Sequence, residues 1–369
     1  MTSSFQVLFG DDNTVRPADG DFYDMVDTVE VEENADLPGA FQFTLPITTF
    51  VESSGEDLRV VGDDRFRPYS RVAVVVGVEG ERNACIFDGY VLAHTIHLDR
   101  GTTAATAQVW GQDMSCLMNL VDKTQERPGT DGQTANTIFG EYHFRTGDDN
   151  QVDDGPDYQL ENHVLIQRGT DMQFLRERAR RTGRLFRVCC DERPGENKGY
   201  FIKPNLDGEA VTTLRLNPVE TANVESLDFS WDVTRPTEVM AKSLVKSKDA
   251  VDGGAQHSGL SLLDQRSLSD FAGDKRVTKA RLSATVGDAG ELRSRSQSLL
   301  REAGWFVRCE GEADLASLRF VMRVGTVVQI AGAGKLLSGK YFVWNVRHTI
   351  SAESHRVRFV LLRNAVGIS

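Results

Sequence analysis

The stretch with the clearest structural signal is residues 161–190, which reads ENHVLIQRGTDMQFLRERARRTGRLFRVCC. Thr170 stands where a helix N-cap belongs, and Gln173 three residues later completes the spacing of a capping box. Leu175 and Ala179 fall on one helical face, and Gly183 occupies the position of a C-terminal cap. The pattern predicts a helix over Thr170 to Arg181. Residues 185–190 and 199–202 read as strands beside it, so this part of the chain is a mixed α+β unit.

Upstream of this unit the sequence has the pattern of short β-strands. Residues 22–31 contain period-2 stretches, and residues 41–45 alternate apolar and polar side chains as a half-buried strand does. Further strands are expected at residues 72–78, 84–93 and 106–110, with turn-forming residues between them. Short strands at hairpin spacing indicate a small barrel or sandwich.

Downstream a second β-rich unit begins near Val224 and contains one helix, expected at residues 290–303. Its strands are expected at residues 238–245, 323–330, 341–350 and 355–362.

The two β-rich units resemble each other. Residues 72–77, 87–91 and 94–96 of the first correspond to residues 325–330, 338–343 and 348–350 of the second, although the spacing from glycine to histidine differs by four residues. A chance match and a duplicated barrel both fit these residues.

Composition excludes several classes of protein. The 369 residues are 40% hydrophobic and 26% charged, which is the profile of a soluble globular protein. We expect no signal peptide at the N-terminus and no membrane insertion, because the longest apolar run, near residues 72–78, is far shorter than the roughly 20 residues of a membrane helix. The net charge of −12 argues against nucleic-acid recognition, which needs a clustered basic face.

The five cysteines are odd in number and irregularly spaced, and no CxxC motif occurs. We therefore expect reduced, partly buried thiols, with neither a disulfide framework nor a thiolate zinc site.

No motif in the chain predicts catalysis or a cofactor. Residues 331–335, AGAGK, lack the first glycine and the hydroxyl residue of a phosphate-binding loop, so a glycine-rich hairpin connection is favoured. His94 and His97 would point to opposite faces of a strand, and His348 and His355 lie on different strands without a carboxylate cluster. Structural roles are therefore predicted for these histidines. No GxSxG, HExxH or kinase motif appears.

The acidic segments at residues 148–157 and 11–36 do not fit the calcium-loop template, and we interpret them as solvated surface. The opposite charge gathers in one place, where seven arginines lie between Arg168 and Arg187 with two acids among them. This segment is either a solvated helix face or a contact surface for acidic protein.

Residues 161–175 resemble the late control gene D and VgrG hub family, in which a strand ending in Gln is followed by a Ser/Thr-Asp helix start and a Phe-Leu pair. Residues 178–186, the motifs at 87–91 and 108–113, and the C-terminal segments 325–328, 339–343, 346–348 and 363–364 are similar to the same family, in the same order. The resemblance touches most of the chain and covers the hub portion of that family only, without the β-helix needle.

This resemblance implies a β-rich α+β fold with two similar small β-barrel domains, at residues 1–122 and 223–369, and an α+β middle domain at residues 123–222. It implies a structural baseplate hub of a contractile phage tail-like particle, made in the bacterial cytoplasm. Three chains with two barrels each would form a ring of pseudo-six-fold symmetry that adapts a hexameric inner tube to a trimeric spike.

The implied partners are two further chain copies, a spike protein, an inner tube or tube-initiator protein and other baseplate proteins. No enzyme activity, cofactor or metal is expected. Arg176 and Arg180, four residues apart on one helical face, are the residues we expect at an interface. Two alternatives stay open: a β-rich hydrolase of cell-envelope glycans that uses two carboxylates, and a free-standing binding module.

Overall fold

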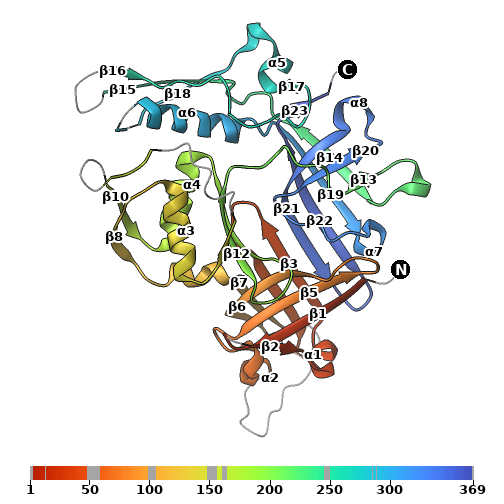
Figure 1. The fold of residues 1–369 in the computed structure, drawn as a ribbon. Helices are drawn as coiled ribbons and strands as arrows, with labels where there is room; N and C mark the ends of the chain where they lie inside the picture. The colour runs from red at the N-terminus through yellow and green to blue at the C-terminus, as the bar shows by residue number, and fades with distance from the viewer. Residues whose placement is uncertain are drawn as a thin grey trace.

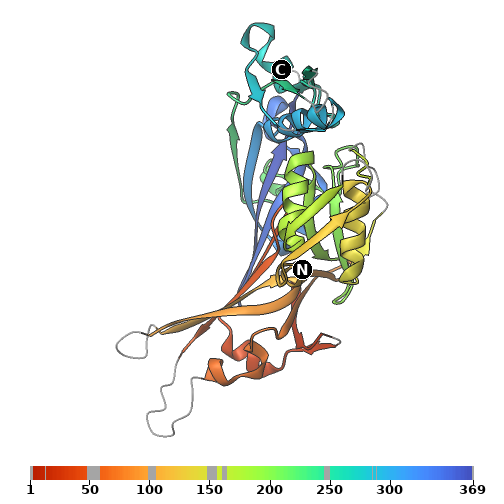
Figure 2. The same ribbon diagram turned by 90° about the vertical axis from the view of Figure 1, so that its left-hand side faces the viewer.

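The computed structural model describes residues 3–12, 14–47, 59–98, 105–147, 156–159, 164–244, 250–284, 286–287 and 289–367. One twisted sheet of 13 strands runs through the molecule, and a smaller helical unit packs beside it (Figures 1 and 2). The main path of the sheet follows the order β14-β19-β22-β21-β3-β4-β7-β6-β5-β1-β2. Beside this path β20 pairs with β21, and β13 pairs with β20.

The N-terminal half of this sheet consists of antiparallel strands, with short helices at its margin. The strands are β1 (Ser3–Gly10), β2 (Val15–Pro17), β3 (Thr28–Asn34), β4 (Ala40–Pro46), β5 (Arg71–Val78), β6 (Ala84–His97) and β7 (Thr106–Asp113). The helices are α1 (Gly20–Met25), α2 (Arg59–Gly62), η1 (Asp64–Phe66) and η2 (Met114–Asn119).

The middle unit combines two helices with two small sheets, one of two strands and one of three. Its elements are β8 (Lys123–Arg127), α3 (Asp131–Glu141), β9 (Arg145–Thr146), β10 (Leu165–Gly169), α4 (Asp171–Thr182), β11 (Leu185–Cys190) and β12 (Asn197–Ile202). Phe139, Leu175 and Phe201 belong to its own apolar core, separate from the larger core that both halves of the main sheet share.

The C-terminal half completes the main sheet and adds a small sheet with a helix on it. The strands are β13 (Thr213–Arg215), β14 (Ser226–Trp231), β15 (Glu238–Leu244), β16 (Ala250–Asp252), β17 (Arg266–Ser267), β18 (Lys279–Leu282), β19 (Val307–Asp314), β20 (Val327–Ala331), β21 (Gly339–Ile350), β22 (His355–Arg363) and β23 (Ala365–Val366). The helices are η4 (Val219–Thr221), α5 (Leu268–Ala272), η5 (Asp274–Arg276), α6 (Ala289–Ala303), α7 (Leu315–Leu318) and α8 (Gly334–Leu337).

The predicted β-rich α+β class is confirmed, and most expected elements lie within a few residues of their predicted bounds. The structure differs from the predicted pair of small barrels in one respect. Among the described residues the strand pairings form one open path from β14 to β2, so the two β units share a sheet and neither half closes on itself. The division of the chain after residues 122 and 222 stays a prediction.

The predicted glycine-rich connection joins the antiparallel strands β20 and β21, and it includes the one-turn helix α8. Two local predictions are corrected. Part of the segment 22–31 is helix α1, because the Asp19 carboxylate accepts the backbone N–H of Phe22 and starts a turn there. Cys85 and Cys190 form a disulfide, with Cα atoms 5.8 Å apart, because β6 and β11 pack together although 105 residues separate the cysteines.

The acidic segment 148–157 lies almost entirely outside the described residues, so its predicted role is untested. None of the described helices is both long and apolar enough to cross a membrane.

Candidate assembly interface

Helix α4 has the caps that its sequence predicts. The Thr170 hydroxyl accepts the backbone N–H of Gln173, the Gln173 side chain accepts the backbone N–H of Thr170, and Gly183 ends the helix in the left-handed conformation at φ 62°. Leu175 and Ala179 are buried in the core of the middle unit. The opposite face carries the two arginines predicted at an interface: Arg176 is half-buried and Arg180 is exposed.

An acidic side chain of the same chain lies close to both arginines. Burial raises the pKa of the Asp36 carboxyl, which follows β3, while the positive charges of Arg176 and Arg180 oppose that rise. The structure therefore brings the two predicted residues together beside the β3–β4 turn. Asp36 satisfies part of their charge within the chain, and whether they also contact another molecule stays a prediction.

Other arginines of the same segment hold the middle unit together. Arg178 donates to both carboxylate oxygens of Asp131 at 2.7 and 2.8 Å, and both side chains are buried. Arg187 lies 4.4 Å from the Tyr200 ring centroid and donates to the Val324 carbonyl, which ties the middle unit to the C-terminal half. The sequence alone could not separate these buried cations from the exposed ones, because all occur within one arginine-rich segment.

The two halves of the main sheet repeat one strand order. In the first half the order is β5-β6-β7-β4-β3, and in the second it is β20-β21-β22-β19-β14. Each long central strand carries a β-bulge directly after a valine: β6 between Val91 and Ala93, and β21 between Val343 and Asn345. A bulge inserts one extra residue and bends its strand, so the same bulge in both halves gives them the same local curvature.

The backbone around these two valines is also the same. Val91 exchanges backbone hydrogen bonds of 2.8 and 2.9 Å with Tyr69 and Ser70, and Val343 exchanges two of 2.9 Å with Gly325 and Thr326. Tyr69 and Gly325, which occupy equivalent positions, both have positive φ angles, of 64° and 86°. The bulges match residues 87–91 with 339–343, within the predicted correspondence of 87–91 with 338–343. They match Tyr69, rather than Val72, with Gly325, which corrects the predicted correspondence of 72–77 with 325–330. They match Ile96, rather than His94, with His348, which corrects the predicted histidine correspondence.

One junction joins the two repeats within the chain. Past its bulge, β21 pairs antiparallel with β3 over six residues, with His348 opposite Val31. On the solvent side Arg347 donates to Glu32 at 2.6 Å. At the end of β3, Arg323 donates to Glu33 at 2.7 Å and to the Cys190 carbonyl at 2.7 Å. We call this junction the β3–β21 seam.

A buried histidine pair lies under the seam. His348 Nδ1 is 2.9 Å from His355 Nε2, and burial lowers the pKa of both rings, that of His355 to about 4. The two rings therefore stay neutral and share one proton in this contact. Structural roles were predicted for His348 and His355, but their contact was not, because it depends on the register of the strands that carry them.

The counterparts of the seam strands have free edges. β14 corresponds to β3, and among the described residues it pairs with β19 only. The part of β6 beyond its bulge corresponds to the part of β21 that pairs with β3, and within the described chain it pairs with β7 only. Leu98 is 51% exposed, whereas its counterpart Ile350 is 2% exposed. We call the β14 edge and the β6 edge beyond the bulge the free seam edges.

Asp113 and His94, two titratable side chains that could suggest a reactive site, both have protein partners. Burial raises the pKa of Asp113 to about 6, but its carboxylate accepts hydrogen bonds from the backbone of Gly39 and Ser115. The cavity beside it is about 20 Å³, little more than the roughly 10–15 Å³ that one water molecule needs, and is too small for a substrate. His94 Nε2 contacts the Phe66 carbonyl at 2.6 Å. No group of three or more metal-ligating side chains occurs in the described part of the chain.

Comparison with solved structures finds the same fold in phage tail proteins. The 43 kDa tail protein of prophage MuSo2 from Shewanella oneidensis has a TM-score of 0.67 at 13% identity, over 98% of this chain and 100% of that one. The tail protein from Neisseria meningitidis MC58 has a TM-score of 0.64 at 12% identity, over 99% and 97%. An E. coli component of the type VI secretion system, described as similar to bacteriophage T4 tail proteins, has a TM-score of 0.52 at 15% identity, over 92% and 73%.

At these identities the likenesses show the fold alone, and they place the β-rich α+β architecture with tail proteins over nearly the whole chain. No curated protein matches the sequence. One family model does, over residues 48–352, and it is described as the Alg8 N-terminal domain. Because this match covers most of the chain, the protein belongs to the Alg8 N-terminal domain family.

Proposed function

We propose that this chain is a structural baseplate hub of a contractile phage tail-like particle, of the late control gene D and VgrG type. The observation that carries the proposal is the end-to-end fold match with the Shewanella tail protein, over 98% of this chain and 100% of that one. The whole fold is shared, rather than one common module, so a role in the same kind of assembly is the simplest account.

The internal repeat supports a ring of three chains. Each chain carries two copies of one strand order, so three chains present six similar faces. Such a ring matches a hexameric inner tube on one side and a trimeric spike on the other. Ring closure requires each chain to offer complementary edges to its neighbours, as a cyclic oligomer does.

The free seam edges are these complementary edges. Within the chain, the second repeat receives β3 of the first along the outer half of β21. In the proposed ring, β14 of one chain pairs in the same way with the part of β6 beyond its bulge in the neighbouring chain. The bulges fix the register of this proposed pair: Thr95 lies opposite Ser230, Ile96 opposite Phe229 and His97 opposite Asp228.

The chemistry of the paired residues fits this register. Ile96 and Phe229 are both half-buried against the main core, so pairing completes the burial of apolar side chains on the inner face. His97 and Asp228 are both exposed polar residues on the outer face, where Thr349 and Glu30 lie opposite each other in the seam. Pairing also covers the sheet edges that an isolated chain leaves open.

Arg176 and Arg180 belong to a second, polar part of the proposed assembly surface. Asp36 lies beside them within the chain, yet Arg180 is exposed on a chain of net charge −12. We propose that they contact a neighbouring hub chain or an acidic surface of another baseplate protein. Arginine suits such contacts because its planar guanidinium can pair with a carboxylate at two points.

Mass measurement tests the hub proposal. Native mass spectrometry of the protein with its spike, or of intact particles, should give three copies of this chain. A monomer in dilute solution is consistent with the proposal, because ring closure depends on concentration. A monomer or dimer within assembled particles would rule it out.

The glycan hydrolase alternative has a separate test. Purified protein is incubated with peptidoglycan, and soluble fragments are measured by chromatography. We expect no release above a heat-denatured control. Reproducible cleavage would show that the chain is an enzyme and would require a new account of its carboxylates.

A further inference from the structure

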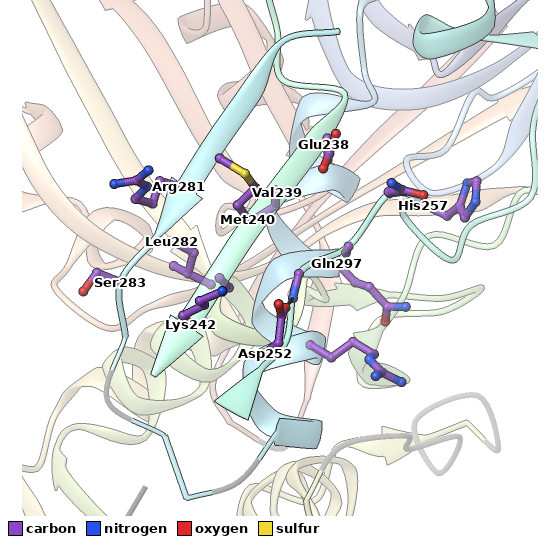
Figure 3. Close-up of a pocket in the computed structure, with 15 residues that line it drawn as sticks. Glu238, Val239, Met240, Lys242, Asp252, His257, Arg281, Leu282, Ser283 and Gln297 are labelled. Atoms are coloured by element: carbon purple, nitrogen blue, oxygen red, sulfur yellow. Dashed lines mark hydrogen bonds between the residues drawn. The ribbon is translucent and has the colours of Figure 1, made fainter. Parts of the chain in front are cut away.

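A cavity lies away from the seam, on the small sheet formed by β16, β15 and β18. Its volume is about 1010 Å³, and the segment of residues 254–257 and helix α6 complete its lining (Figure 3). Val239 and Ala241 of β15 are buried, and Ala241 packs with Leu292 of α6. Met240 and Lys242, which alternate with them, are exposed on the opposite face of the strand.

The charges on this lining are unbalanced. The Glu238 carboxylate is neutralised by Lys279 at 2.9 Å. Lys242, Arg281 and Arg293 are exposed, and in the described part of the chain none of the three forms an ion pair. Asp252 is the remaining acid, and its side chain accepts the backbone N–H of Gly254 at 3.1 Å. A cationic cavity on a chain of net charge −12 is complementary to an acidic ligand.

The apolar part of the cavity narrows the class of ligand. Met240 is 39% exposed and lies directly opposite Arg281 in the parallel β15–β18 pair. A flexible thioether beside a guanidinium suits a ligand that carries both acidic and aliphatic groups.

We propose that this cavity binds an extended acidic peptide segment of a partner protein. Carboxylates at alternate positions of that segment lie on one side of the extended peptide and contact Arg281 and Lys242, while the aliphatic part of one of these side chains packs on Met240. The proposal does not depend on the hub function, since the single chain contains the whole cavity.

Fluorescence anisotropy with a labelled synthetic peptide tests this proposal. The probe is Glu-Val-Glu-Leu-Glu-Val-Glu, and its matched control is Lys-Val-Lys-Leu-Lys-Val-Lys. We expect the acidic peptide to bind about tenfold or more tightly than the basic one at low salt, and to weaken as salt screens the contacts. Equal affinity of the two peptides, or no binding of the acidic peptide at millimolar concentration, would overturn the proposal.

Protein variants localise the binding. R281E combined with K242E should weaken the acidic peptide about tenfold or more. The control, R168E combined with R215E, makes the same charge change at two exposed arginines outside the cavity and should weaken it less than about threefold. Circular dichroism checks that both variants are folded. Equal losses in the two variants would show that net charge alone attracts the peptide.

Two further outcomes also contradict the proposal. Tighter binding of single-stranded DNA than of the acidic peptide would assign the cavity to nucleic acid. Salt-sensitive self-association that R281E with K242E abolishes, without any peptide binding, would assign it to a second copy of this chain.

Discussion

The β3–β21 seam and the free seam edges are two versions of the same junction. In the seam, Val31 lies opposite His348 and is fully buried. At the free edges the corresponding residues, Phe229 and Ile96, are half-buried, although their strands have the same order and the same bulge. Among the described residues the chain therefore completes one junction by itself and leaves the other without a partner strand, which the proposed ring of chains would supply.

The largest contrast should come from the same substitution on either side of the comparison. Val31→Asp places a carboxylate in the sealed seam and should lower the free energy of unfolding by about 4 kcal/mol, because a buried, unpaired charge is costly. Phe229→Asp, at the free edge, should lower it by about 1 kcal/mol while preventing assembly. Urea denaturation and native mass spectrometry measure the two effects. Equal loss of stability in both variants would mean that the free edge is already sealed in the single chain.

The second contrast lies within the seam, between its two ion pairs. Glu33→Ala leaves Arg323 without its carboxylate in a largely buried position and should cost about 3 kcal/mol. Glu32→Ala removes the partner of Arg347 on the exposed side and should cost about 1 kcal/mol or less. Denaturant titrations of both variants decide this. Similar small losses would show that neither ion pair holds the two repeats together.

The histidine pair makes the seam sensitive to acid. Burial lowers the pKa of His348 and His355 in the folded state. The unfolded chain therefore binds more protons between about pH 4, the pKa of His355 in the folded chain, and the unfolded value near 6.5. The stability that the neutral pair contributes is complete above pH 6.5 and is lost as the pH falls toward 4, by roughly 1.4 kcal/mol per pH unit for each histidine.

His348→Ile with His355→Ala gives the seam the residues of the first repeat, Ile96 and Ala105, and should remove this dependence. Asp113, whose pKa burial raises to about 6, acts in the opposite direction. The quantity to measure is therefore the difference in unfolding free energy between wild type and double variant across this pH range. A difference that does not change with pH would contradict the account of the pair.

The smallest effect should come from the arginine patch. Arg176→Glu with Arg180→Glu should keep the helix content and change stability by about 1 kcal/mol or less, because the contacts with Asp36 are partly solvated. Assembly should weaken, and more at low salt than at high salt. Circular dichroism and sedimentation over a salt series measure both. Normal assembly at every ionic strength would show that the patch is a solvated helix face.

Local sequence patterns predicted the local structure well. Thr170, Gln173 and Gly183 predicted helix α4 correctly, because the interactions that cap a helix lie within a few residues of it. The matched segments 87–91 and 339–343 indicated the repeat, because each ends at its bulge.

Long-range contacts could not be predicted in the same way. The Cys85–Cys190 disulfide, the His348–His355 contact and the position of Asp36 beside α4 all depend on which strands pair and in what register. The prediction that the two β units form separate barrels was wrong for the same reason, because the pairing of β3 with β21 joins the two units.

A cross-link between the free seam edges tests the central claim most directly. Thr95→Cys and Ser230→Cys are combined in one chain and treated with a short thiol cross-linker under assembly conditions. The proposed register places these residues opposite each other, with Cβ atoms about 5 Å apart, so denaturing gels should show a ladder that ends at three chains. The matched control pairs Thr95→Cys with Ser226→Cys, which is displaced by about 13 Å along the strand and should give little product. Assembled particles without the Thr95–Ser230 cross-link, or with equal yields from the two pairs, would contradict closure of the ring through β6 and β14.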